Sequence, residues 1–557
     1  MNDLSVTLAS ALHDAAQDLR AAGLPGEVSS QLLSLMEQVD QPCVVAVVGR
    51  VKVGKSTFVN ALLGEDLARV GVTETTATIN YFRHGAPNRD RPVRCYWRDG
   101  HVTDEDRAFL DGLQGSSIET LRRADAILRL EYHLMNRYLE HVTLVDTPEI
   151  GSVVDDHQNR TAEHLGLAQQ LRARTIKESE RLRSEADAVL FLFDSVARAI
   201  DRELLRELQE VTQGQEGAHN TIGVMTKVDQ YPDVLSQRVA MASEIEAQLR
   251  GIITTVVPVS AEIERFRARL VDGEGDALRH LADSLRQVPH DVLQELLGMD
   301  ELYLGPHPAC PLSIEQRKLL MGDVSWRAFA TTSLVAADAS LDPVTVNSRL
   351  RELSGFDQVT DVLERRLFRR SRLLRQYGIV TRAQRLVASF GKRHLEDFTR
   401  QSAENRARRA RFLAFIGASA GDPSIAQELE TFIHDHLADR PSLEPLIRRL
   451  EITLARIYWQ LDAHREDYDA LQQIEDHRDL FSTSELEELL PLLGLHGFEI
   501  EQRLPDGRVN LSFINERATT WRGVEISDQY DVRRDVGRQA ALRYRFLGDE
   551  VRGRSRA

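Results

Sequence analysis

The sequence predicts an α/β protein with a mainly parallel, doubly wound sheet and an appended α-helical bundle or stalk. Residues 43–48 form a continuous apolar, β-branched run, typical of a strand buried on both faces. From residue 379 to about 479 nearly every stretch has helical periodicity, which predicts the helical region. Helical patterns separate most of the further short apolar runs, as in a parallel sheet; these runs are 77–82, 126–130, 142–145, 188–193, 222–225 and 256–259.

The composition excludes several classes of protein. The chain has 557 residues, of which 42% are hydrophobic and 28% charged, as in soluble globular proteins. Its net charge of −16 argues against binding by bulk charge, so we expect no nucleic-acid partner. Cys43, Cys95 and Cys310 are too far apart in sequence to suggest a disulfide framework or a zinc site. Without a signal-peptide pattern or an apolar run of ~18 residues, the expected location is cytoplasmic.

Breaks between these patterns predict that the chain has four parts. A helix over residues 350–377 is expected to close the α/β domain, and Gly417-Ala-Ser-Ala-Gly-Asp-Pro423 predicts a turn within the helical region. A hairpin is expected around Pro505-Asp506-Gly507. The parts are N-terminal helices at 1–40 that pack on the helical bundle, an α/β domain at 41–372 with insertions of loops and short helices at about 84–125 and 262–345, a helical bundle or short stalk at 373–480, and a C-terminal mixed segment at 481–557.

A phosphate-binding loop follows the first predicted strand. Gly49-Arg-Val-Lys-Val-Gly54-Lys55-Ser56 matches G-x-x-x-x-G-K-[ST] and opens a predicted helix. Main-chain amides and the helix N-terminus would hold the phosphates, Lys55 would reach the β- and γ-phosphates, and the Ser56 hydroxyl would ligate Mg²⁺. The alternative is a chance match in a glycine-containing turn. The expected nucleotide contacts here are Gly49, Val53, Gly54, Lys55, Ser56 and Thr57.

A base-reading segment, Thr226-Lys227-Val228-Asp229, follows the apolar run 222–225. The Asp229 carboxylate can accept from guanine N1–H and the 2-amino group, a donor pair that adenine lacks. Charge-assisted hydrogen bonds contribute ~1.5–3 kcal/mol each, so this pair favours GTP over ATP. The Lys227 stem can cover the ring, and Ser260-Ala261, at the end of another predicted strand, suits a backbone contact to the guanine carbonyl. The alternative is a surface turn whose aspartate caps the next helix.

Two further segments suggest Mg²⁺ and γ-phosphate contacts. Asp146-Thr-Pro-Glu149 follows the run 142–145, and Asp146 fits a second-sphere Mg²⁺ ligand. In Gly71-Val-Thr-Glu-Thr-Thr-Ala77 we favour Thr76 as the threonine that contacts Mg²⁺ and the γ-phosphate, with Thr75 and Thr73 as alternatives. The segment could instead be only the threonine-rich start of a strand. The predicted metal contacts are therefore Ser56, Thr76 and Asp146.

Together these motifs resemble those of bacterial dynamin-like GTPases, over residues 41–372. The resemblance implies a P-loop GTPase fold, GTP hydrolysis with Mg²⁺ promoted by dimerisation of two G domains, and self-assembly with its own kind or a related GTPase, often on membranes. Glu149 stands where the family usually has glycine, and a side chain there could blunt γ-phosphate sensing. The segments that carry the resemblance are Gly49-x-Val-Lys-x-Gly-Lys-Ser-Thr57-x-x-Asn60-Ala-Leu-Leu-Gly64, Val72-Thr-x-Thr-Thr-Ala77, Asp146-Thr-Pro, Thr226-Lys-x-Asp229 and a terminal helix that starts at Ser354-Gly-Phe-Asp.

Lys52 is our candidate for the charge that stabilises the transition state. It occupies the P-loop position at which the similar guanylate-binding proteins have an arginine finger, and it would swing toward the β–γ bridge on dimerisation. The alternative is a solvated loop lysine.

Residues 406–416 are a candidate peripheral membrane contact at the inner face of the membrane. Arg406-Ala-Arg-Arg-Ala-Arg411 runs into Phe412-Leu-Ala-Phe-Ile416, and basic residues beside an apolar tip suit an anionic lipid surface. Alternatively, the arginines pair with acidic neighbours and the apolar residues belong to the core of the bundle.

Two functions therefore compete. The leading hypothesis is a self-associating dynamin-like GTPase with a GTP-driven conformational cycle. The alternative is a slow-hydrolysing, GTP-dependent regulatory module that recruits a protein partner. An RNA-linked GTPase is disfavoured by the overall acidity and by the lack of a recognisable RNA-binding module.

Overall fold

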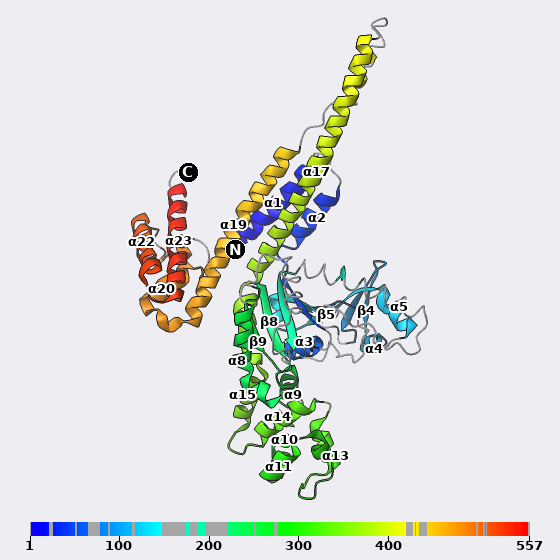
Figure 1. Ribbon diagram of the computed structural model, residues 1–557, viewed down its shortest axis with the longest axis vertical. Coiled ribbons are helices and arrows are strands. Elements are labelled where there is room, and N and C mark those ends of the chain that lie inside the picture. The colour runs from blue at the N-terminus through cyan, green and yellow to red at the C-terminus, as the bar shows by residue number, and fades with distance from the viewer. Residues whose placement is uncertain are drawn as a thin grey trace. The chain divides into compact units, whose positions relative to one another are not determined.

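The chain divides into two compact units (Figure 1). The α/β unit is Pro42–Leu374, and the helical unit combines Met1–Gln41 with Arg375–Ala557. The computed structural model describes residues 2–21, 26–50, 53–64, 78–86, 88, 90–113, 117–146, 174, 177–178, 186–194, 220–249, 252–271, 277–322, 324–418, 427–428, 431–433, 443–496, 500–504, 507 and 509–554.

The described part of the α/β unit contains a nine-stranded mixed sheet in the order β4-β3-β5-β2-β6-β1-β7-β8-β9. Strands β6, β1, β7, β8 and β9 pair in parallel, as does β2 with β5, which confirms the mainly parallel sheet. The strands are β1 (Cys43–Gly49), β2 (Asn80–His84), β3 (Val93–Trp97), β4 (Val102–Glu105), β5 (Ile127–Leu134), β6 (Val142–Asp146), β7 (Ala188–Asp194), β8 (Thr221–Thr226) and β9 (Thr255–Pro258).

Helices cover both faces of this sheet, as a doubly wound fold requires. On one face, Val45 and Val47 of β1 share a core with Phe58 of α3 (Lys55–Leu63). On the other, Ala46 and Val48 share a core with α8 (Pro232–Gln248). Alternate residues of β1 therefore face opposite cores, and both cores are apolar, which explains its unbroken hydrophobic run.

The expectation that residues 84–125 are loops and short helices is partly wrong. This segment supplies β3 and β4, which widen the sheet by antiparallel pairing, besides the short helices α4 (Arg107–Asp111) and α5 (Ile118–Ala126). In β3 only Val93 and Cys95 are buried, and the residues between and after them are polar or aromatic. So short an alternation gives little periodic signal, and its strand character depends on pairing with β5.

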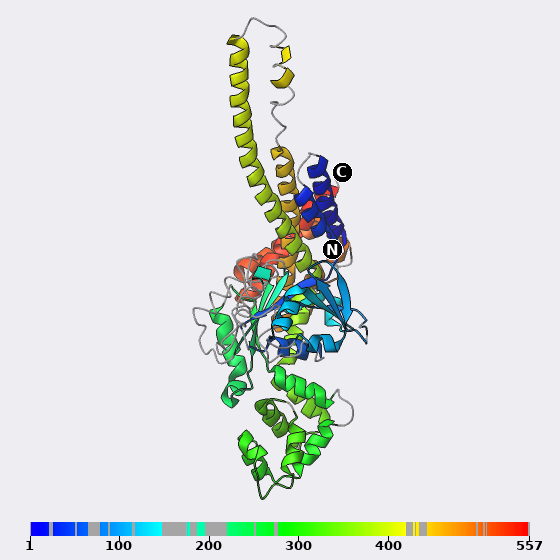
Figure 2. The same cartoon turned by 90° about the vertical axis from the view of Figure 1, so that its right-hand side faces the viewer.

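Residues 262–345 fold into short helices, as expected, but they also form a hydrophobic core of their own around Phe266, Leu285 and Phe329. Figures 1 and 2 show these green helices gathered beyond one end of the sheet. Their bounds are α9 (Ala261–Val271), α10 (Ala277–Arg286), α11 (His290–Leu296), α12 (Asp300–Leu304), α13 (Ile314–Met321) and α14 (Trp326–Ala337).

The single helix expected over residues 350–377 is interrupted. α15 (Pro343–Ser354) ends at Gly355, which has a φ of 75° and starts α16 (Phe356–Leu363). A π-helical turn, Glu364–Phe368, then precedes α17 (Ser371–Ala418). Helical periodicity continues through these breaks, so the pattern alone does not reveal them.

In the helical unit, α1 (Asn2–Ala21) and α2 (Gly26–Glu37) pack beside the long helices α17 and α19 (Glu444–Asp476) (Figures 1 and 2). The Gln376 side chain donates to Ser5 Oγ at 2.6 Å, and the Arg375 guanidinium donates to the Gln38 carbonyl at 3.0 Å. α17 extends to Ala418, and the rest of the turn expected at 417–423 lies outside the described residues. None of the described helices is long and apolar enough to span a membrane.

The expectation of a mixed C-terminal segment with a hairpin is wrong. The described residues there are helical: α20 (Thr483–Leu492), α21 (Ile500–Arg503), α22 (Leu511–Ser527) and α23 (Asp531–Arg554). Helices rather than strands flank Pro505-Asp506-Gly507. A local turn signal therefore does not decide the type of element on either side of it, which tertiary packing can override.

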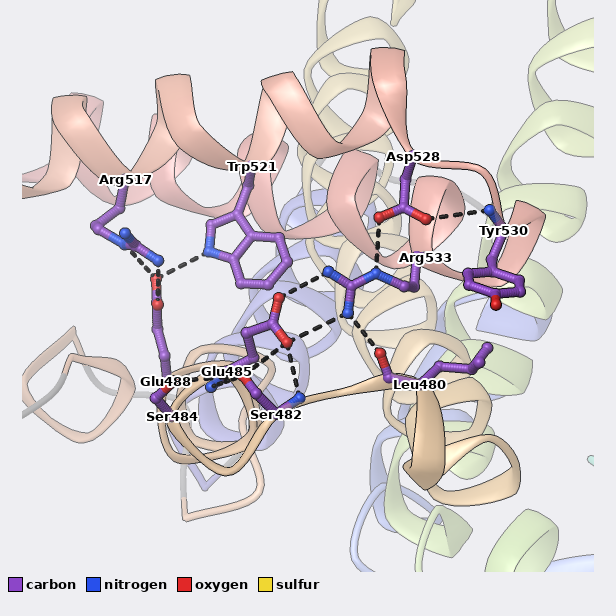
Figure 3. A network of polar contacts seen from close by, with 10 residues as sticks. All are labelled: Leu480, Ser482, Ser484, Glu485, Glu488, Arg517, Trp521, Asp528, Tyr530 and Arg533. Carbon is purple, nitrogen blue, oxygen red and sulfur yellow. Dashed lines mark hydrogen bonds and ion pairs between the residues drawn. The ribbon is translucent and has the colours of Figure 1, made fainter.

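Polar contacts fasten these C-terminal helices (Figure 3). The Arg533 guanidinium of α23 donates to Glu485 Oε1 at 2.7 Å, to Asp528 Oδ2 at 2.7 Å and to the Leu480 carbonyl at 2.6 Å. The Glu488 carboxylate of α20 accepts from the Trp521 indole and from Arg517. Glu485 thus contacts α23, and Glu488 contacts α22 and also α23, whose Tyr544 hydroxyl donates to it at 2.7 Å.

Candidate nucleotide-binding site

The P-loop joins β1 to α3 and depends on two glycines. Gly49 lies against β7, where a Cβ atom would be 2.6 Å from the Leu192 carbonyl oxygen, so a side chain cannot fit without moving the strand. Gly54 has a φ of 89°, in the left-handed region that favours glycine. These positions turn the chain tightly into α3 and direct its first main-chain amides outward from the helix N-terminus.

Lys55 is buried at the start of α3, with 2% of its surface exposed. Its Nζ lies 3.3 Å from the Gly49 carbonyl oxygen, so the side chain folds back along the loop. An ammonium group beside a helix N-terminus is a favourable site for a phosphate, because the ammonium group and the helix N-terminus are both positive. Val53 and Thr57 are buried in the same loop and helix.

Ser56 and Asp146 supply oxygen ligands next to the loop. Ser56 is half-buried in the first turn of α3, and Asp146 is the last residue of β6, with 6% of its surface exposed. β6 pairs in parallel with β1, with Asp146 opposite Val47, two residues before Gly49. A hydroxyl and a carboxylate are the hard donors that Mg²⁺ prefers, so these residues fit that ion.

Thr226 links the loop to the neighbouring strands. Its buried hydroxyl lies 2.7 Å from the Val53 carbonyl oxygen and 3.0 Å from the Phe193 carbonyl oxygen, within hydrogen-bonding distance of both. The end of β8 is thereby fixed against the P-loop and the end of β7. The structure thus brings the predicted phosphate-binding and base-reading segments to the same edge of the sheet.

The carboxylate of Asp229, predicted to read the base, is nearly enclosed, with 7% of the residue exposed. Burial raises its pKa, and a hydrogen bond from the Ser260 side chain and the positive charge of Lys227 oppose that rise. A buried carboxylate needs donors for its oxygens. The N1–H and 2-amino groups of guanine would supply two.

Ser260 caps α9, which Ala261 begins, and only Val259 separates Ser260 from β9. Ser260 is fully buried; its Oγ accepts from the Ile263 amide at 3.1 Å, and its own amide donates to the Ser354 carbonyl at 2.9 Å. Ala261 is the first residue of the helix, so its amide has no acceptor within the helix. That amide is therefore the better candidate for the guanine carbonyl.

Asp194 is a site residue that sequence reasoning missed. It ends β7, and its Oδ2 lies 3.2 Å from the Nζ of Lys227. The available signal was an acidic residue at the carboxyl end of a buried strand, where parallel α/β sheets bind ligands.

Other predicted residues lie outside the described part of the chain. They are Lys52, the three candidate threonines Thr73, Thr75 and Thr76, and Glu149.

Comparisons with known proteins agree with these motifs. Residues 45–228 match the model of the dynamin family. The isoniazid-induced protein IniC of Mycobacterium tuberculosis (strain ATCC 25618 / H37Rv) is 28% identical over 370 residues, which cover 65% of this chain and 70% of IniC. The bacterial dynamin-like protein of Nostoc punctiforme (strain ATCC 29133 / PCC 73102) is 32% identical over 100 residues, covering 16% of this chain and 14% of that protein.

A solved structure of an oligomerised bacterial dynamin pair aligns over 100% of this chain and 75% of the other, with 13% identity and a TM-score of 0.33. So low a score carries no argument about function. The family model and the sequence relatives support the predicted resemblance: residues 45–228 match the dynamin family model, and a relative named as a bacterial dynamin-like protein shares sequence with the chain.

Proposed function

We propose that the protein is a GTPase that binds and hydrolyses GTP with Mg²⁺, and that G-domain dimerisation and self-assembly drive its conformational cycle. The observation that supports this most directly is the enclosed Asp229 carboxylate at the same sheet edge as the P-loop, with Thr226 between them. The family of the domain at residues 45–228 agrees with it. In this proposal the α/β unit is the G domain and residues 373–480 are a stalk on which the N-terminal helices pack.

Each residue has a stated role in the proposal. The amides between Gly49 and Thr57 hold the phosphates, Lys55 contacts the β- and γ-phosphates, and Asp229 with the Ala261 amide selects guanine. Ser56, Thr76 and Asp146 would hold Mg²⁺, which neutralises charge on the phosphate oxygens.

Two measurements test binding and turnover separately. Calorimetry with GTP and ATP should show a marked preference for GTP, and equal affinities would overturn the proposal. The GTPase rate per molecule should rise with protein concentration, because dimerisation completes the site. A slow rate that is independent of concentration would instead favour the regulatory module that recruits a protein partner.

Lys52 is proposed to bring positive charge to the transition state when two G domains meet. Lys52→Ala should lower the concentration-stimulated rate while leaving GTP affinity nearly unchanged, since the charge acts in the transition state. Lys318→Ala, at an exposed position in α13, is the matched control. An unaltered rate in Lys52→Ala under dimerising conditions would exclude this role.

Residues 406–416 are proposed as a peripheral membrane contact. Arg406, Arg408, Arg409 and Arg411 are all exposed near the end of α17, and Leu413 is 50% exposed. The Phe412 ring instead packs on Phe432, with centroids 5.7 Å apart. The full chain should float with anionic vesicles and not with zwitterionic ones. An Arg408→Glu/Arg409→Glu variant that floats equally well would argue against the contact.

A further inference from the structure

The turn between α15 and α16, Ser354-Gly355-Phe356, touches both halves of the candidate nucleotide site. We propose that this turn, the α15–α16 junction, positions the guanine-contacting turn Ser260-Ala261 and the P-loop helix α3 relative to each other. Ser354 and Gly355 are then positioning residues for guanine recognition, and Phe356 is a positioning residue for phosphate binding. The inference rests on the proposed function, since it concerns the same pocket.

The first contact sets which amide faces the base. The Ser354 carbonyl accepts from the Ser260 amide at 2.9 Å, so this donor is already occupied. The next amide, that of Ala261, remains for the purine carbonyl because a first-turn amide has no acceptor within its helix. Ser260 also hydrogen-bonds to the Asp229 carboxylate through its side chain. A shift of Ser260 would therefore disturb both guanine-recognising groups at once.

The second contact is a close approach that only glycine allows. Gly355 has a φ of 75°, and a Cβ atom there would lie 2.1 Å from the Pro258 carbonyl oxygen and 3.4 Å from the Val259 Cα. Pro258 and Val259 lead directly from β9 into Ser260. A side chain at position 355 would thus push on the backbone of the guanine-contacting turn, and a backbone obstacle cannot rotate away as a side chain could.

The third contact reaches the phosphate side. The Phe356 ring packs on the Phe58 ring of α3, with centroids 5.7 Å apart, and both residues are almost fully buried. Phe58 lies in the first turn of the helix that Lys55 opens. One residue of the junction therefore supports the phosphate-binding helix, while the two before it support the base-contacting turn.

A buried ion pair holds the junction in place. The Ser354 hydroxyl lies 2.8 Å from Glu264 Oε2, and the Arg267 guanidinium donates to both Glu264 oxygens, at 2.8 and 3.1 Å. Arg267 also donates to Asn347 of α15 at 2.8 Å. Glu264 and Arg267 are 4% and 6% exposed, and they belong to the helix that Ser260 caps. Such an enclosed, mutually bonded set resists displacement more than exposed contacts would.

The test compares two glycines with a positive φ, 75° at Gly355 and 62° at Gly322. Gly355→Ala strains the backbone and presses on the Pro258 carbonyl. Gly322→Ala also strains the backbone, but its Cβ would meet only the flexible Arg269 side chain. Calorimetry with GDP and IDP measures how well the pocket recognises guanine, because inosine lacks the 2-amino group that Asp229 would bind. Circular dichroism and thermal unfolding report folding of both full-length variants.

We expect Gly355→Ala to bind GDP about tenfold more weakly or worse and to lose part of its preference for GDP over IDP, the scale of one displaced charge-assisted hydrogen bond. Gly322→Ala should bind as the wild type does. If Gly355→Ala does not fold, Phe356→Leu tests the inference instead. This variant should bind GDP and IDP more weakly by the same factor, since Phe356 supports the phosphate-binding helix.

Three results would overturn the inference: a folded Gly355→Ala with wild-type affinity and preference, equal effects of Gly355→Ala and Gly322→Ala, or an unchanged affinity in Phe356→Leu. A wild-type chain without preference for GDP over ADP would instead overturn the proposed function. The two failures are thus distinguishable.

Discussion

The ammonium of Lys227 and the carboxylate of Asp194 form an ion pair of 3.2 Å between the ends of β8 and β7. Among the described residues Lys227 is the only one other than glycine with a positive φ, 58°. The left-handed backbone directs the side chain, and the carboxylate anchors its tip. The four-carbon stem between these two fixed points can then cover a purine ring.

Asp194→Asn should weaken GTP and GDP binding alike, by up to about fivefold, because partly exposed ion pairs contribute ~0.2–1 kcal/mol. The preference for guanine over adenine should persist, since Asp229 is unchanged. Calorimetry with GTP, GDP and ATP measures both quantities, with Asp300→Asn in α12 as an exposed acidic control. A collapse of guanine preference in Asp194→Asn would show that Asp194 does more than anchor Lys227.

Asp229→Asn should change which base is bound. It removes an acceptor for the 2-amino group and should weaken GTP binding by at least about tenfold, since each charge-assisted hydrogen bond contributes ~1.5–3 kcal/mol. The asparagine amide can instead donate to the 2-carbonyl of xanthine. Competition binding with GTP and XTP should therefore show a reversed preference. A variant that still prefers GTP would place the base elsewhere.

Acid should loosen the helical unit through Glu485. Its hydrogen bonds with Arg533 lower the pKa of Glu485 from 4.5 to about 2. Because the folded-state pKa is the lower one, this stabilisation is complete above pH 4.5 and is lost as the pH falls from 4.5 toward 2. At neutral pH, Glu485→Gln should unfold at a lower temperature than the wild type. On acidification the two unfolding temperatures should converge.

Glu487→Gln, at an exposed position of the same helix α20, is the matched control. If Glu485→Gln and wild type keep a constant difference in unfolding temperature down to pH 2, the ion pair with Arg533 does not carry the effect.

Asp467 should be a strong determinant of stability in the helical unit. It is fully buried in α19, with Arg503 Nη1 at 2.9 Å, Arg543 Nε at 3.0 Å and Gln539 Nε2 at 3.0 Å. Asp467→Asn leaves two buried guanidinium groups without their carboxylate, so we expect a loss of about 3–5 kcal/mol in urea unfolding. Asp479→Asn, at an exposed position, should lose almost nothing. Equal effects would contradict a buried charge cluster.

The sheet shows where sequence reasoning succeeds. Four strands are apolar and buried, so their composition alone predicts their burial; they are β1, β6, β7 and β8. β3 and β4 were missed because only one face of β3 is buried and β4 has no buried residue, which leaves pairing as their main support. At the C-terminus the Asp-Gly turn signal suggested strands, whereas Trp521 and Tyr544 are buried between helices.

The motifs of the candidate site can be predicted from the sequence alone, because each depends on residue types at fixed short spacing directly after a strand. The doubly wound sheet can be predicted in the same way, from runs that are apolar on both faces. The contact of Asp194 with Lys227 and the support of Ser260 by the α15–α16 junction, in contrast, appear only in the folded structure. These contacts join residues about 30 and 90 positions apart, and which strand ends and helices meet depends on strand order and packing.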